Sequence, residues 1–169
     1  MKSELVRIAL AEVGVREDGG NNRGERVRLY QAATWLAPDA WPWCAAFTAW
    51  VLREALRTTA GLAFLGAHKS DPWRCKDASA FGWETWAQKK GLQVLPESQL
   101  ARAGDFVVFD FSHIGIVVSD QLTVRDELVT VEGNTNGKGE RDSVSGDGVW
   151  RKTRKPSLVK SYLRLGAKA

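Results

Sequence analysis

Long apolar runs are missing from this sequence. No stretch of 18 apolar residues occurs, so we predict no transmembrane helix. The N-terminal segment carries Glu4, Arg7 and Glu12 within its apolar pattern, which interrupts the hydrophobic core that a signal peptide requires. We therefore expect a protein that is made in a cytoplasm without a standard signal peptide.

Metal-binding side chains are also scarce. The 169 residues include two cysteines and two histidines, and no paired CxxC motif occurs. A structural zinc site normally takes four such ligands, so we expect no metal and no other cofactor. A disulfide between Cys44 and Cys75 is disfavoured, because thiols stay reduced in proteins that are not exported.

The composition is typical of one globular domain. With 44% hydrophobic and 26% charged residues, the chain can bury a proper core, and we expect a single domain over residues 1–169 that is monomeric. The net charge is +4, and residues 150–169 carry most of the excess. A mildly basic surface favours an anionic partner such as nucleic acid, anionic lipid or a cell-wall polymer.

The hydrophobic pattern changes period near residue 100. Before it, helical spacing predicts helices over residues 3–13, 25–36, 43–57 and 77–91, with irregular structure over residues 58–78. After it, short β-branched and aromatic runs predict strands over residues 104–111, 113–120, 127–134, 148–154 and 158–165. Helices followed by an antiparallel meander make an α+β domain.

Residues 41–50, WPWCAAFTAW, place a cysteine at the start of the third predicted helix. Cys44 is compatible with a buried core position and with a nucleophile, because a helix N-terminus and a nearby imidazole both lower a thiol pKa. Of the two histidines, His68 lies in a polar, loop-like stretch and is interpreted as a surface residue. His113 opens a predicted strand at a hairpin edge, where it is either a satisfied strand-end residue or the partner of the thiol.

An imidazole in that role needs a polar partner on its far nitrogen. The next predicted strand ends with Glu132 and Asn134, and either side chain can hold the His113 ring. Alternation along a strand places Thr130 and Glu132 on the same face. A thiol on a helix, a histidine on a strand and a polar residue on the next strand form the layout of papain-like cysteine hydrolases.

Eight tryptophans are many for this length. Trp41 and Trp43 flank the cysteine, and Trp73 lies between the two halves of the chain. Together with Ser112, which precedes the second histidine, they are candidates for contacting a substrate in a groove. Core packing is the alternative for the indoles, and for Trp43 the sequence leaves the two alternatives equal.

Five segments between about residues 11 and 155 resemble the CHAP domain, the cysteine, histidine-dependent amidohydrolase/peptidase family. They are NNRGERVRLYQ, WPWCAAFTAWV, AGDFVVFDFSHIGIVVS, VTVEGNT and GDGVWRKTR. The similarity is to single-domain versions in phage lysins and related bacterial cell-wall hydrolases. It implies a papain-like fold, in which N-terminal helices pack on an antiparallel sheet or partial barrel of about five to six strands, and hydrolysis of a peptidoglycan amide bond.

Carried onto this chain, the resemblance implies roles for four residues. Cys44 matches the family nucleophile, His113 the base and Glu132 the third member. Asn134 matches a polar residue that some members use as a fourth, and either Glu132 or Asn134 can dominate. Calcium is not predicted, because the acidic loop of calcium-binding members is incomplete in the stretch REDGGNNRGE.

The resemblance also implies a partner and a place of action. A phage endolysin would be made in the host cytoplasm and would act on peptidoglycan after release. Its basic C-terminal region would contact an anionic wall or outer-membrane surface in place of a separate wall-binding domain. One alternative is an interbacterial amidase effector with the same chemistry. Another is a non-catalytic nucleic-acid-binding module, which is disfavoured because the cations are not interleaved with exposed aromatic residues along one element. The choice between amidase and endopeptidase stays open.

Overall fold

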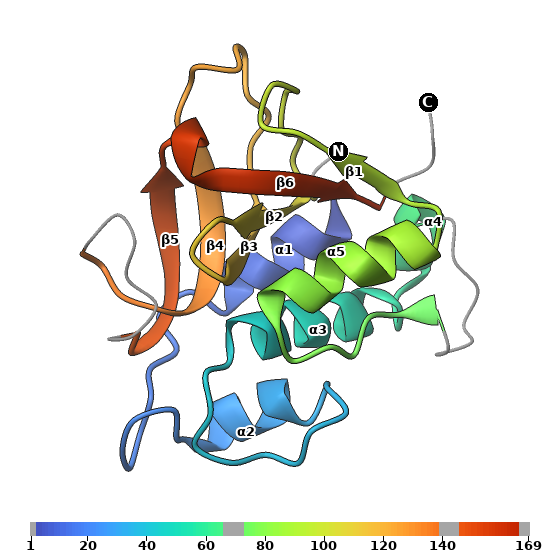
Figure 1. Ribbon diagram of the computed structural model, residues 1–169. Coiled ribbons are helices and arrows are strands. Elements are labelled where there is room, and N and C mark those ends of the chain that lie inside the picture. Colours follow the sequence, from blue (N-terminus) through green and yellow to red (C-terminus); the bar gives the residue numbers. More distant parts are fainter. Residues whose placement is uncertain (1–2, 66–72, 139–145, 166–169) are drawn as a thin grey trace.

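The two halves of the chain form two kinds of structure, as Figure 1 shows. The structure is a computed structural model that describes residues 3–65, 73–138 and 146–165, so the surface position expected for His68 lies outside the described residues. In these ranges the helices are α1 (Glu4–Ala11), α2 (Glu25–Gln31), α3 (Cys44–Ala55), α4 (Thr59–Leu65) and α5 (Ala80–Lys89). The strands are β1 (Gln93–Leu95), β2 (Phe106–Phe109), β3 (His113–Val117), β4 (Leu128–Thr135), β5 (Gly148–Arg154) and β6 (Val159–Arg164). The predicted α+β class is confirmed.

The strands form one six-stranded sheet with the order β1-β6-β2-β3-β4-β5. Every neighbouring pair is antiparallel. Strands β2 to β5 are the predicted meander, and β6 returns to pair with β2. Because the order ends at β1 on one side and at β5 on the other, the described sheet is open and not a closed barrel.

Helix α3 is the centre of the hydrophobic core. It is apolar on nearly every face, and ten of its twelve residues are buried. It contacts α1, α2 and the strands β3 and β4, and Figure 1 shows it between α2 and the sheet. Burial of each large apolar side chain stabilises the fold by roughly 1.5–3 kcal/mol, so this helix holds a fixed position against the sheet.

Strand β1, which pairs with β6, was not predicted. Two helices also differ from the sequence predictions. Helix α2 ends at Gln31, five residues early, because the amide of Trp35 donates to the carbonyl of Lys76 in a distant loop instead of continuing the helix. Helix α4 lies in a segment predicted to be irregular, and its first turn is capped by the Thr58 hydroxyl, which accepts from the Gly61 amide. Tertiary contact explains the first difference and an overlooked cap the second.

None of the helices in the described part of the chain combines the length and the hydrophobicity that crossing a membrane requires.

The approach of β4 to α3 depends on Gly133. A Cβ atom at this position would lie 2.5 Å from Cβ of Phe47 and 2.9 Å from Cζ3 of Trp43. Both neighbours are fully buried, so neither can move away without repacking the core. The strand therefore needs glycine here to lie directly against the first turn of the helix.

We expect Gly133→Ala to lower the free energy of unfolding by about 1–3 kcal/mol, because it overpacks this contact. Urea denaturation followed by circular dichroism measures the change. A loss smaller than about 0.5 kcal/mol, the range of ordinary surface substitutions, would contradict the close packing described here.

Candidate active site

The Cys44 thiol lies at the open end of α3. Cys44 is the first residue of the helix, as predicted, and only 7% of it is exposed. The first helical hydrogen bond is donated by the amide of Phe47 to the carbonyl of Trp43, so the amides of residues 44–46 are not used within the helix. The first turn thus presents backbone donors and the positive end of the helix dipole beside the sulfur.

His113 is the first residue of β3, also as predicted, and its ring is fully buried. The ring lies nearly parallel to that of Phe111, with 5.6 Å between centroids, and 6.0 Å from that of Phe109. Its Nε2 lies 2.8 Å from Oε2 of Glu132, while Nδ1 has no hydrogen-bond partner among the described residues. Since Nε2 is engaged, Nδ1 is the nitrogen left to interact with the Cys44 thiol.

The Glu132 carboxylate is fully buried on β4, the strand next to β3. Beyond His113 it accepts hydrogen bonds from the Thr130 hydroxyl at 2.6 Å and from Arg154 Nε and Nη2 at 2.9 and 2.5 Å. The contact between Thr130 and Glu132 confirms that both side chains lie on one face of the strand. The bidentate ion pair with Arg154 supplies the charge that a buried carboxylate needs.

Arg154 is a part of the site that the sequence did not reveal. It ends β5, is only 1% exposed, and its guanidinium lies over the rings of Phe109 and Phe111 at 5.3 and 5.5 Å. Arginine is common on solvated strands, and nothing local distinguishes Arg154 from Arg151, which is exposed on the same strand. Only the pairing of β4 with β5 brings the buried arginine to the carboxylate.

The three titrating groups shift one another's pKa values. Burial would raise the pKa of the Cys44 thiol, but the positive charge of the neighbouring His113 ring and the amides of Ile114 and Ala45 outweigh it, so the pKa is lowered. Burial opposes the charged form of His113 as well, yet interactions with Cys44 and Glu132 raise its pKa to about 9. These opposite shifts favour a thiolate–imidazolium pair at neutral pH.

The carboxylate is ionised for the same kind of reason. Burial would raise the pKa of Glu132, but hydrogen bonds from Arg154 and His113 lower it to about 2. At neutral pH the imidazolium, the carboxylate and the guanidinium therefore alternate in sign, and the lowered pKa of Cys44 favours the thiolate beside the imidazolium. Each buried charge has an opposite neighbour, which is the condition for burying four charged groups together.

A second glycine makes room for this arrangement. A Cβ atom on Gly115 of β3 would lie 2.6 Å from Cγ of Glu132. The missing side chain lets the glutamate lie flat across β3 and reach the His113 ring two residues earlier. The glycine within the HIGIV motif thus has a steric role in the site.

The structure also locates the other residues that the sequence analysis proposed for catalysis or substrate contact. Asn134 is buried with φ of 53° on β4, and the carboxylate that contacts His113 is that of Glu132. Trp43 is fully buried, stacks on Tyr30 and donates to Glu17 at 2.8 Å, so it packs the core and has no surface for a ligand. The remaining candidates stay predictions: Trp41 and Trp73 are half-buried, and Ser112 is exposed with φ of 60°.

Cys44 and Cys75 are free thiols. In the described ranges, no group of three or more His, Cys, Asp or Glu side chains is arranged to hold a metal ion. A thiol beside an imidazole is a pair that can supply a nucleophile and an acid–base group.

Comparison with known proteins adds no relative. No protein-family model matches the chain, and a search of curated proteins finds no match.

We expect Arg154→Met to lower the free energy of unfolding by about 3–5 kcal/mol, because it leaves the buried Glu132 without its bidentate partner. Urea denaturation at pH 7 measures the loss. Arg151→Met is the matched control, since it removes the same charge from an exposed position of β5, and should change stability by less than about 0.5 kcal/mol. Equal effects of the two substitutions would show that the Arg154–Glu132 pair does not hold the site together.

We expect iodoacetamide to modify Cys44 in the folded protein and to leave Cys75 unmodified. Burial raises the pKa of Cys75 to about 12, whereas the pKa of Cys44 is lowered. The labelling rate should therefore reach its plateau at a lower pH than that of a free thiol, whose pKa is about 8.5. Intact-mass and peptide spectrometry measure both results, and comparable labelling of the two cysteines would rule out a selectively activated Cys44.

Proposed function

We propose that the protein is a papain-like cysteine hydrolase of the CHAP type that cleaves an amide bond in peptidoglycan. The observation that carries the proposal is a buried series of four neighbouring side chains. It begins with Cys44 at the start of α3 and continues through His113, Glu132 and Arg154 on the sheet. Its hydrogen bonds and pKa shifts support amide hydrolysis by a thiolate. The peptidoglycan substrate and the lysin-like role are supported by the WCAAF, HIGIV and EGNT motifs and by the net charge of +4.

In the proposed reaction, the Cys44 thiolate attacks the carbonyl carbon of the scissile amide. The backbone amide of Cys44 faces the developing oxyanion, because it makes no helical hydrogen bond. The imidazolium of His113 then donates its proton to the leaving amine, and a thioester forms on Cys44. Neutral His113 next takes a proton from water, the resulting hydroxide attacks the thioester, and the acid product leaves the regenerated thiolate–imidazolium pair.

Glu132 and Arg154 act in this scheme as positioning residues. Glu132 holds Nε2 of His113 and thereby keeps Nδ1 turned toward the sulfur. Arg154 holds the carboxylate in turn and keeps it ionised. Because both are buried, the ring cannot easily rotate away from the thiol between the two proton transfers.

The direct test is digestion of purified peptidoglycan, with the products weighed by mass spectrometry. The wild-type protein should release fragments, while Cys44→Ser should lose at least about 100-fold in rate with an unchanged circular dichroism spectrum. Clearance by Cys44→Ser at the wild-type rate would refute the assignment.

The mass spectra of the products also identify which amide bond of peptidoglycan is cleaved. Release of an intact peptide from muramic acid would define an amidase, and a new free amino group within the peptide would define an endopeptidase.

We also expect the rate of hydrolysis to fall above about pH 9. The pKa of His113 is raised to about 9, so the imidazolium that protonates the leaving amine persists at neutral pH and is lost as the pH rises through that value. The pH profile of kcat/KM, measured from pH 6 to 10.5, should show this loss on its alkaline side. The apparent pKa of that fall belongs to the interacting Cys44–His113 pair. A limb near pH 6.5, the ordinary histidine value, would contradict the proposed ion pair.

A further inference from the structure

A hollow lies beside the loop that precedes α5, and Cys44 is not among the residues that line it. Its volume is about 350 Å³, which is within the usual range of small-ligand sites. The walls are the indoles of Trp35 and Trp86, and the buried Cys75 also lines it. Trp35 is 67% exposed, an unusual state for the largest apolar side chain and one that suits a ligand-covered surface.

The hollow is strongly cationic. Arg74, Lys76 and Lys89 line it together with one acid, Asp77. The Asp77 carboxylate is turned to the start of α5, where it accepts from the Ser79 amide at 2.8 Å. The Arg74 guanidinium donates to the carbonyl of Ala33, which holds this cation near the two indoles. An apolar floor with a cationic rim fits a ligand that joins an anionic group to aliphatic atoms.

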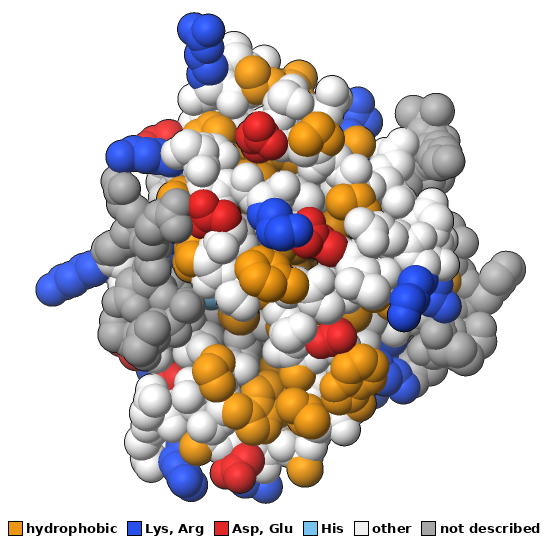
Figure 2. All heavy atoms as spheres, in the orientation of Figure 1, with side chains coloured by type: hydrophobic (Ala, Val, Ile, Leu, Met, Phe, Trp, Pro, Cys, Tyr) orange, Lys and Arg blue, Asp and Glu red, His pale blue; other side chains and the backbone are white. Residues whose placement is uncertain are grey.

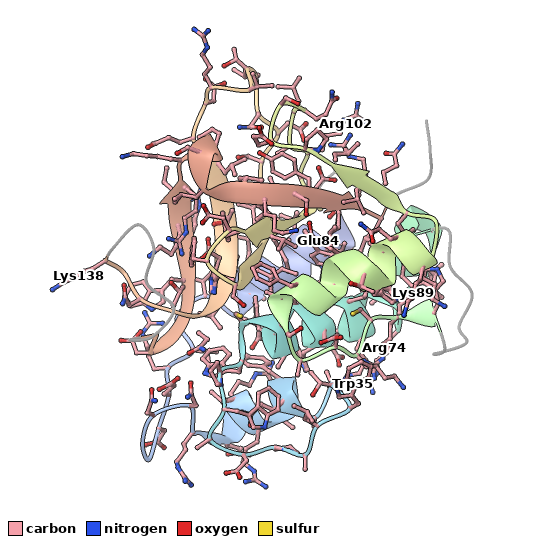
Figure 3. The ribbon with its side chains drawn as sticks, in the orientation of Figure 1. Trp35, Arg74, Glu84, Lys89, Arg102 and Lys138 are labelled. Atoms are coloured by element: carbon pink, nitrogen blue, oxygen red, sulfur yellow. The ribbon has the colours of Figure 1, made fainter. Side chains whose placement is uncertain are left out.

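The segment that carries Trp35 leads along the chain to Cys44. The amide of Trp35 donates to the carbonyl of Lys76, and the chain from Trp35 runs through residues 36–43 directly to Cys44. Figure 3 shows Trp35, Arg74 and Lys89 together on one side of the molecule, near α3 and the end of α5. Figure 2, in the same orientation, shows hydrophobic side chains gathered on the lower part of this face with Lys and Arg side chains at their right-hand edge.

We propose that this hollow is a substrate subsite that binds a free carboxylate of the peptidoglycan peptide stem, with Lys89 at its rim and Trp35 packing on the adjoining aliphatic atoms. The inference rests on the proposed function. In peptidoglycan the sugars carry no free acid once the lactyl group is joined to the peptide, so the negative charge is on the stem carboxylates. Amidation of these carboxyls removes the charge without changing the size of the stem, which makes the subsite selective between amidated and non-amidated walls.

The test measures binding separately from cleavage. Calorimetric titration of the Cys44→Ala protein at low ionic strength would use muramoyl-L-Ala-D-Glu-diaminopimelate and the same compound with its stem carboxyls amidated. We expect the carboxylate form to bind more tightly. Lys89→Gln in the same background should reduce that preference by about two- to five-fold, the usual size of an exposed ion pair.

Lys90→Gln is the matched control. Lys90 is exposed, lies next to Lys89 at the end of α5 and does not line the hollow, so its removal changes the net charge equally. The preference should survive in Lys90→Gln. No preference in the Cys44→Ala protein, or equal losses in the two lysine variants, would overturn the subsite.

Cleavage by the wild-type protein separates this inference from the function on which it rests. A preference for the carboxylate ligand without cleavage of peptidoglycan would leave the subsite standing and refute the hydrolase. Cleavage of peptidoglycan without any preference for the carboxylate ligand would support the hydrolase and refute the subsite.

Discussion

The buried carboxylate of Glu132 is the group on which the rest of the site depends. It lies between the ring of His113 on one side and the guanidinium of Arg154 on the other, with every partner within 2.9 Å. An isolated carboxylate at this depth would be neutral, because burial opposes charge. The two cationic partners keep it ionised. The pKa of His113 is raised first by Cys44 and then by this carboxylate. Glu132 thus influences the charge state of the thiol indirectly, through the ring of His113.

The fold supplies what this chain of charges requires. The central helix α3 brings its first turn against β4 only because Gly133 has no side chain, and Gly115 leaves the space across β3 that Glu132 fills. The neighbouring strands β3, β4 and β5 each contribute one charged side chain, and the antiparallel pairing of these strands fixes the positions of the three side chains relative to one another. A substitution in the packing can thus disturb the chemistry without touching a reacting atom.

The α+β class and the positions of Cys44 and His113 at the starts of their elements can be predicted from the sequence, because local signals carry them. Cys44 follows Pro42 at a helix start, and His113 follows a break between two strand-like runs, so their positions can be predicted from turn and helix signals. Arg154 could not be predicted, because its role depends on pairing between strands that are distant in sequence. The alternatives for Trp43 and the early end of α2 were likewise decided by tertiary contacts, which a single sequence does not display.

The central claim is that His113 is held as an imidazolium in a buried site at neutral pH. The chain has two histidines, so nitrogen-15 NMR of ring-labelled protein gives two titration curves, and His68→Gln assigns them. We expect the His113 ring to titrate with a pKa of about 9, and the pKa to fall when Cys44→Ala removes the thiolate that raises it. A His113 ring that is neutral at pH 7, or that titrates near its ordinary value of about 6.5 in both proteins, would contradict the account.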